Sequence, residues 1–178
     1  MSEKSSKWIK DLFQLFLIID MIDLNQIKQR IQKGEDIEKI VEDIDWKEFE
    51  ELVMKILEEH DFHPFHNFRF RMNRLYEIDV LATKNNLVLG IDCKQWNRGR
   101  YKKTGLKYAV KTQKKRMKKF QKMLNNAITK DILNLPEKTK IIPLIVTWFE
   151  EDLIQHEKVF IVPIWKFNQF LLNLSEYI

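Results

Sequence analysis

The sequence is poor in cysteine, glycine and proline. Its 178 residues include one cysteine, Cys93, which excludes an internal disulfide and is too little for a zinc finger or an iron–sulfur cluster; such a chain suits a reducing compartment. Four glycines and four prolines, beside 44% hydrophobic residues, exclude collagen-like and low-complexity chains. We therefore expect a folded chain with one hydrophobic core, alone or with a small appendage.

Long apolar runs are also missing. The apolar stretch over residues 15–19 lies between Gln14 and Asp20, so it is too short to span a membrane. No small-residue cleavage site of a signal peptide follows it. We therefore expect a soluble, cytoplasmic protein with no membrane partner.

Acidic residues are absent between Asp92 and Asp131, where the sequence has 14 lysines and arginines. The net charge of the whole chain is +5, so the remainder of the chain carries −9. A segment of one sign repels itself unless a polyanion lies against it, which favours nucleic acid over an anionic membrane surface or a merely solvated helix face. The cations that we expect to bind DNA are Arg98, Arg100, Lys102, Lys103, Lys107, Lys111, Lys114, Lys115 and Lys118.

Hydrophobic periodicity predicts an α/β fold. Residues 1–44 read as an N-terminal helical extension, and residues 45–178 as the core. Helical spacing predicts helices over residues 46–60, 105–126 and 165–174, whereas strand patterns follow Pro64 and cover residues 75–82, 87–95, 141–146 and 159–163. A tight turn at Asn85-Asn86 makes the first three strands a meander, and the helix over 105–126 is expected to connect two parallel strands.

Carboxylates cluster on two of the predicted strands. Glu77 and Asp79 are two residues apart, as are Asp92 and Lys94, so each pair shares a face of its strand. The opposite face is expected to be apolar and to hold Ile78, Val80, Ile91 and Cys93. Clustered carboxylates repel one another, and hard oxygen ligands suit Mg²⁺ or Mn²⁺. A lysine beside such a metal suggests phosphodiester hydrolysis.

Two further groups lie close to these segments in the sequence. Glu50 lies at the edge of the apolar stripe of helix 46–60, where it either turns toward the core or extends outward to solvent. His60, His63 and His66 are evenly spaced, but a three-residue step alternates faces in a strand, which disfavours a zinc site.

The segments Phe49-Glu50, Glu77-Ile78-Asp79-Val80 and Asp92-Cys93-Lys94-Gln95 resemble the PD-(D/E)XK nuclease superfamily, and look most like its Mrr-type restriction endonucleases and archaeal Holliday junction resolvases. The resemblance covers about residues 45–165 and implies a restriction-endonuclease-like mixed central β-sheet flanked by helices. It implies that Asp79 and Asp92 bind the metal, that Lys94 is the catalytic lysine, that Glu50 completes or tunes the metal site and that Gln95 supports it. Ile78 stands where the family pattern has proline, and Glu77 competes with Glu50 as the additional carboxylate.

Two function classes follow from these residues. The first is a magnesium-dependent DNA endonuclease, and the second is a non-catalytic nucleic-acid-binding module with a degenerate nuclease fold. We favour the first because carboxylates beside a phosphate would oppose binding in a protein that only binds. A peripheral membrane protein bound through the lysine-rich helix is a weaker third class. The DNA specificity and a homodimeric state stay open.

Overall fold

The computed structural model describes residues 29–30, 33–35, 46–95, 102–149, 151 and 153–177. The predicted helical extension therefore lies outside the described residues, apart from the two short pieces before residue 36. Arg98 and Arg100 also lie outside them, as do the side chains of Lys102 and Lys103.

The described chain forms helices and strands in the order expected for the core. They are α4 (Trp46–Glu59), β1 (His63–Arg71), β2 (Leu75–Lys84), β3 (Leu87–Lys94), α5 (Lys102–Met123), α6 (Ala127–Ile132), β4 (Lys140–Thr147), β5 (Gln155–His156), β6 (Val159–Pro163), α7 (Ile164–Leu172) and the 3-10 helix η1 (Leu174–Glu176). The short elements α6 and β5 were not predicted, because six and two residues are too few to show a period. None of the described helices is long and apolar enough to cross a bilayer.

The strands form one six-stranded mixed sheet in the order β1-β2-β3-β4-β6-β5. β1, β2 and β3 are antiparallel, which confirms the meander, and Asn85 in its second turn has a φ of 53°. β3 and β4 are parallel, as expected for two strands joined by α5, and β6 is parallel to β4. The expected mixed sheet flanked by helices is therefore confirmed.

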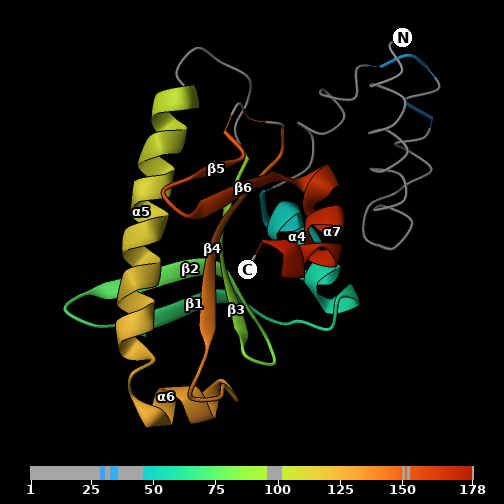
Figure 1. Ribbon diagram of the computed structural model, residues 1–178. Coiled ribbons are helices and arrows are strands. Elements are labelled where there is room, and N and C mark those ends of the chain that lie inside the picture. Colours follow the sequence, from blue (N-terminus) through green and yellow to red (C-terminus); the bar gives the residue numbers. More distant parts are fainter. Residues whose placement is uncertain are drawn as a thin grey trace.

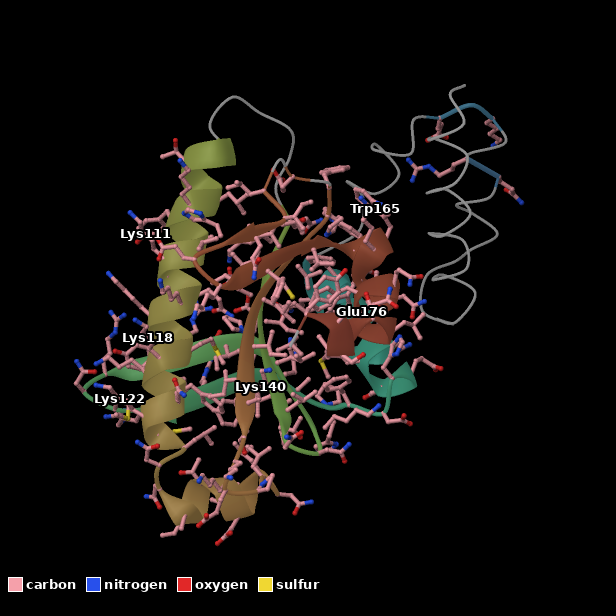
Figure 2. All side chains as sticks on the ribbon, in the orientation of Figure 1. Lys111, Lys118, Lys122, Lys140, Trp165 and Glu176 are labelled. Atoms are coloured by element: carbon pink, nitrogen blue, oxygen red, sulfur yellow. The ribbon has the colours of Figure 1, made fainter. Side chains whose placement is uncertain are left out.

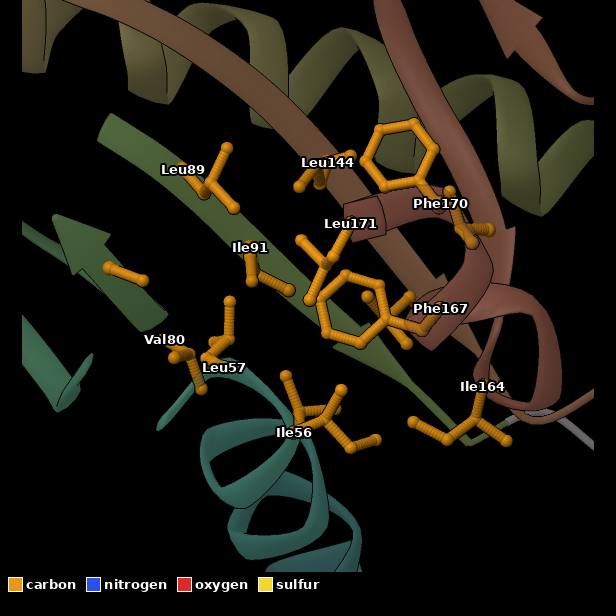
Figure 3. Packing of buried hydrophobic residues seen from close by; sticks show 14 of the residues in the cluster. Ile56, Leu57, Val80, Leu89, Ile91, Leu144, Ile164, Phe167, Phe170 and Leu171 are labelled. Carbon is orange, nitrogen blue, oxygen red and sulfur yellow. The ribbon is translucent and has the colours of Figure 1, made fainter. Parts of the chain in front are cut away.

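Helices cover both faces of the sheet (Figure 1). α4 and α7 lie on one face, where they enclose the largest apolar cluster together with side chains of β2, β3, β4 and β6. Figure 3 shows this packing, in which Ile56 and Leu57 of α4 approach Val80 and Ile91 of the sheet. α5 lies on the other face.

The contact of α5 with the sheet depends on Gly90 of β3. A Cβ at this position would overlap the thioether of Met117 in α5. The Gly90 carbonyl also accepts a hydrogen bond of 2.7 Å from Nε2 of Gln113. The absence of a side chain at Gly90 thus lets α5 approach the strand that carries Asp92.

One expectation about the faces of β2 is wrong. Val80, Ile91 and Cys93 pack on the α4 side as expected, but Ile78 packs on the α5 side. In a regular strand, Ile78 and Val80 would point to the same face of the sheet. Here they point to opposite faces, so the regular alternation of side chains along β2 is broken at Asp79. On β1, the neighbouring residues His66 and Phe68 pair with Val80 and Ile78, while Asn67 between them has a φ of 50° and no pair in the ladder. The ladder is thus interrupted at this left-handed residue, which a period-two pattern does not reveal.

Candidate active site

Asp92 is the centre of a charged cluster near the carboxyl end of β3. Its side chain is 5% exposed and faces α5. Nζ of Lys94 lies 2.9 Å from Oδ2 of Asp92, and Nη1 of Arg116 lies 2.8 Å from Oδ1. Asp92 and Lys94 therefore meet as the two-residue spacing on a strand requires. Both oxygens of the carboxylate have a cationic partner.

Asp79 joins Asp92 from the neighbouring strand. Val80 and Ile91 form the last pair of the β2–β3 ladder, so Asp79 and Asp92 follow it directly on the two strands. Oδ2 of Asp79 accepts a hydrogen bond of 2.8 Å from the backbone N–H of Cys93. Burial, and then the negative charge of Asp92, raise the pKa of Asp79 to about 6. The two carboxylates are thus close enough to repel each other.

Gln113 and Arg116 of α5 belong to this cluster, although neither was predicted as a site residue. Nη1 of Arg116 also donates to Oε1 of Gln113 at 2.8 Å. Gln113 is fully buried and donates to the backbone carbonyls of Gly90 and Leu144 at 2.7 and 3.3 Å. The sequence contains one signal for this pair, because Gln113 is a polar residue in the apolar stripe of the helix and Arg116 follows one turn later.

Glu50 turns toward the core, as one of the two readings of its position proposed. Its side chain is 6% exposed, and Oε2 lies 2.6 Å from Nε2 of His66 on β1. The pKa of the Cys93 thiol is raised by burial and then by the charges of Asp79, Glu50 and Asp92. Glu50 thus has His66 as its direct partner, and its charge acts on the Cys93 thiol, which follows Asp92 on β3. Its role as a metal ligand stays a prediction.

The other candidate groups have separate partners. Glu77 is 43% exposed and pairs with Arg69 at 2.6 Å, so it lies within the β1–β2 ladder. His60 contacts Asn168, and His63 packs edge-on against Phe65. The three histidines thus share no centre. Gln95 follows β3 directly and is half-buried.

The donor atoms at Asp79 and Asp92 fit a hard divalent cation. Over the described ranges no group of three or more His, Cys, Asp or Glu side chains is arranged to hold a metal ion, so a cation at this place would have at most two carboxylate ligands from these residues. Mg²⁺ is commonly held by one or two carboxylates together with water and substrate phosphates. The backbone bond to Oδ2 of Asp79 orients this carboxylate, and a cation would relieve the repulsion between the two acids.

The lysines of α5 lie beside this cluster and mostly face solvent. Lys111, Lys118 and Lys122 point away from the sheet along the outer side of the helix (Figure 2). Lys107 and Lys115 are also exposed. Lys114 differs, because its Nζ pairs with Glu157 at 2.7 Å. α5 thus presents one basic surface to solvent and one polar contact to Asp92.

A six-stranded mixed sheet with flanking helices is consistent with a nuclease-like fold. Residues 45–148 match the nuclease-related domain, NERD, and the chain belongs to this family. The match begins at α4 and ends after β4, so it includes Glu50, Asp79, Asp92, Lys94 and Arg116.

Two further similarities were found. An uncharacterized protein of Archaeoglobus fulgidus is 30% identical over 102 residues, which are 57% of this chain and 69% of that protein. The crystal structure of a protein of unknown function, AF1548, aligns with a TM-score of 0.40 at 20% identity and covers 74% of this chain and 67% of that one.

Proposed function

We propose that this member of the nuclease-related domain family is a DNA endonuclease that uses Mg²⁺ or Mn²⁺. The observation that carries the proposal is the meeting of Asp79, Asp92 and Lys94 at one end of the β2–β3 ladder. This cluster lies beside the lysine-rich helix α5, which has no acidic residue. Carboxylates that can hold a cation therefore stand next to a surface that attracts phosphates.

Each residue of the cluster has a distinct part in this proposal. Asp79 and Asp92 would hold the cation, which polarises a phosphate and makes water a better nucleophile. Lys94, 28% exposed, can turn from Asp92 to stabilise the negative charge that develops on the phosphate. Glu50, whose carboxylate is buried, would complete or tune the site, and Gln95 would support the end of β3.

The proposal also covers the nearest nuclease families, the extent of the nuclease core and the surface that binds DNA. We place the chain nearest to Mrr-type endonucleases and archaeal Holliday junction resolvases, with residues 45–178 as the nuclease core and residues 1–44 as an extension. DNA would lie along the outer side of α5, where Lys107, Lys111, Lys115 and Lys118 are exposed. A homodimer is compatible with this arrangement.

One observation favours a second candidate, a DNA-binding module without catalysis. Both oxygens of Asp92 already have cationic partners, Lys94 and Arg116, so the aspartate also has a purely structural explanation. In this second function the cluster would hold α5 against β3, and the lysines of α5 would bind DNA without cutting it.

Cleavage assays distinguish the two candidates. The protein is incubated with Mg²⁺ or Mn²⁺ and a panel of plasmid, single-stranded, flap and four-way-junction DNA, with EDTA as the blank. We expect cleavage of at least one substrate, and we expect Asp79→Asn, Asp92→Asn and Lys94→Ala to slow it by about a thousandfold or more. DNA affinity should hold or rise in the aspartate variants, because a repulsive charge is removed.

Glu77→Gln is the matched control for these variants. It removes a carboxylate from the same strand as Asp79, but its partner is the exposed Arg69. We expect it to cut DNA at nearly the parent rate. The absence of any cleavage by the parent protein would support the binding module, and equal cleavage by all four variants would show that the site is misassigned.

A further inference from the structure

The formal charges of Asp79, Asp92, Lys94 and Arg116 are balanced, while the carboxylate of Glu50 has His66 as its partner. Asp79 and Asp92 contribute two negative charges, and Lys94 and Arg116 contribute two positive ones. A divalent cation bound to the aspartates would leave two positive charges in excess. Since charges interact strongly in a half-buried site, that excess weakens cation binding unless another anion arrives or a resident cation leaves.

Arg116 is the resident cation whose position is built into the fold. Gln113 anchors it through hydrogen bonds to the carbonyls of β3 and β4, and the guanidinium bonds both Oε1 of Gln113 and Oδ1 of Asp92 at 2.8 Å. The Arg116 side chain is nevertheless 19% exposed, so solvent or a ligand has access to it. It also stands on the helix that carries the exposed lysines.

We propose that Arg116 is an internal counter-ion, which pairs with Asp92 in the metal-free protein and turns to a DNA phosphate when a divalent cation binds. A phosphate is the natural second partner, because guanidinium groups bind phosphate with two parallel hydrogen bonds. Cation and DNA then bind together, and each raises the affinity for the other by the same factor. The inference rests on the proposed metal-dependent function, and it identifies Arg116 as the residue that couples the binding of the divalent cation to the binding of DNA.

The first test measures the binding of Mn²⁺ alone to the DNA-free protein, from the electron paramagnetic resonance signal of free Mn²⁺. Arg116→Gln removes the counter-ion, so we expect it to bind Mn²⁺ about tenfold or more tightly than the parent. Lys119→Gln is the matched control, since it removes a positive charge one turn further along the same side of α5. We expect it to stay within about twofold of the parent.

Arg116→Lys tests whether the positive charge at this position, rather than a change in folding, determines the affinity for Mn²⁺. It keeps a positive charge near Asp92 but cannot reproduce the planar guanidinium, and we expect it to bind Mn²⁺ as weakly as the parent. Binding as tight as in Arg116→Gln would overturn the inference. A thermal melt of each variant in EDTA shows whether it is folded before its Mn²⁺ affinity is compared.

The second test measures coupling. The affinity for a short fluorescent DNA duplex is determined by anisotropy at constant ionic strength, with Mn²⁺ or with EDTA, and a denaturing gel verifies that the duplex is uncut. We expect Mn²⁺ to raise the DNA affinity of the parent and of Lys119→Gln about tenfold, and that of Arg116→Gln by much less. Equal coupling in all three proteins would overturn the inference.

Asp92→Asn distinguishes failure of the inference from failure of the proposed function. If the parent and Arg116→Gln bind Mn²⁺ equally and Asp92→Asn does not bind it, the metal site stands and the counter-ion role is wrong. If no variant binds Mn²⁺, with or without DNA, both the inference and the metal-dependent function are wrong.

Discussion

The two faces of the sheet are covered by helices in different ways. On the face of α4 and α7, the buried residues form one continuous apolar cluster that extends from β2 to β6. On the face of α5 there are two smaller clusters, one around Met117 and Phe120 and the other around Leu106 and Val110. Gln113 lies between these groups along the helix and is bound to backbone carbonyls.

The difference indicates that the face of α4 and α7 mainly stabilises the fold, whereas the face of α5 carries the polar and charged groups. A continuous apolar face excludes water and contributes most of the free energy of folding, whereas buried polar groups contribute little unless every partner is present. The α5 face accepts such groups where Asp92 and Arg116 meet, and it carries the lysines on its outer side. We therefore expect substitutions on the two faces to differ in their effects on unfolding and on DNA binding.

The largest effect on stability is expected at Phe167 of α7, which is fully buried in the continuous cluster. Phe167→Ala should lower the free energy of unfolding by about 3–5 kcal/mol, because it leaves a cavity in a close-packed region. Denaturant unfolding measures this loss. Leu172→Ala, at a residue of the same helix that is 61% exposed, should change stability by less than about 0.5 kcal/mol. Equal losses in both variants would contradict a core centred on this face.

The next largest effect is expected at Asp79, whose pKa is raised from 3.8 to about 6. A raised pKa means that the folded protein binds the proton more tightly than the unfolded chain, so stability is lost as the pH rises through 6. In EDTA at about pH 8, Asp79→Asn should therefore stabilise the protein, by about 3 kcal/mol at most. The gain should shrink as the pH falls from 6 toward 4, where the folded carboxyl is protonated, and it should vanish below 3.8, where the unfolded one is protonated as well.

Glu77→Gln serves as the comparison for Asp79→Asn across the same pH range. Its carboxylate is exposed beside Arg69, so we expect a change of less than about 1 kcal/mol. Chemical denaturation at several pH values measures both variants. A gain for Asp79→Asn that does not depend on pH would show that the burial of its charge is not the cause.

A smaller effect is expected at Gln113, where the two clusters of the α5 face are separated. Gln113→Leu removes the partners of the Gly90 carbonyl and of Arg116, so it should destabilise the protein by about 1–3 kcal/mol despite the added apolar surface. Gln121→Leu places the same side chain at an exposed position of α5 and should change stability by less than about 0.5 kcal/mol. A more stable Gln113→Leu would mean that the polar contact is dispensable for folding.

The smallest effect on stability, with a large effect on DNA binding, is expected for the outer lysines of α5. Replacing Lys111, Lys115 and Lys118 by Gln should leave unfolding nearly unchanged but reduce the salt dependence of DNA binding, by about 0.9 in the logarithmic slope for each lost phosphate contact. Lys114 is omitted because it pairs with Glu157. Titrations of labelled DNA at several salt concentrations measure the slope.

A triple variant with lysines replaced outside α5 is the control for this surface. Lys47 on α4, Lys166 on α7 and Lys138 before β4 supply the same change in net charge. We expect their replacement by Gln to leave the slope within about one unit of the parent value. The same reduction in both triple variants would indicate that only net charge matters and that DNA has no preferred surface.

Much of the fold follows from patterns within single segments. The apolar spacing of Trp46–Glu59, the strand pattern of Leu87–Lys94 and the polar turn at Asn85 all predicted their elements correctly. The two-residue spacing also placed Asp92 beside Lys94. These features are local, because a helix or strand period determines which side chains share a face.

The contacts between segments were decided only by the tertiary structure. Ile78 packs on the α5 side next to the point where the β1–β2 ladder is interrupted, at Asn67 of another strand. The contact of Glu50 with His66 and that of Asp92 with Arg116 depend on how α4 and α5 dock on the sheet. By itself the sequence determined which residues carry charge and which elements they occupy. The docking of helices determined their partners, because the direction of a long side chain is set by the surface that its helix meets.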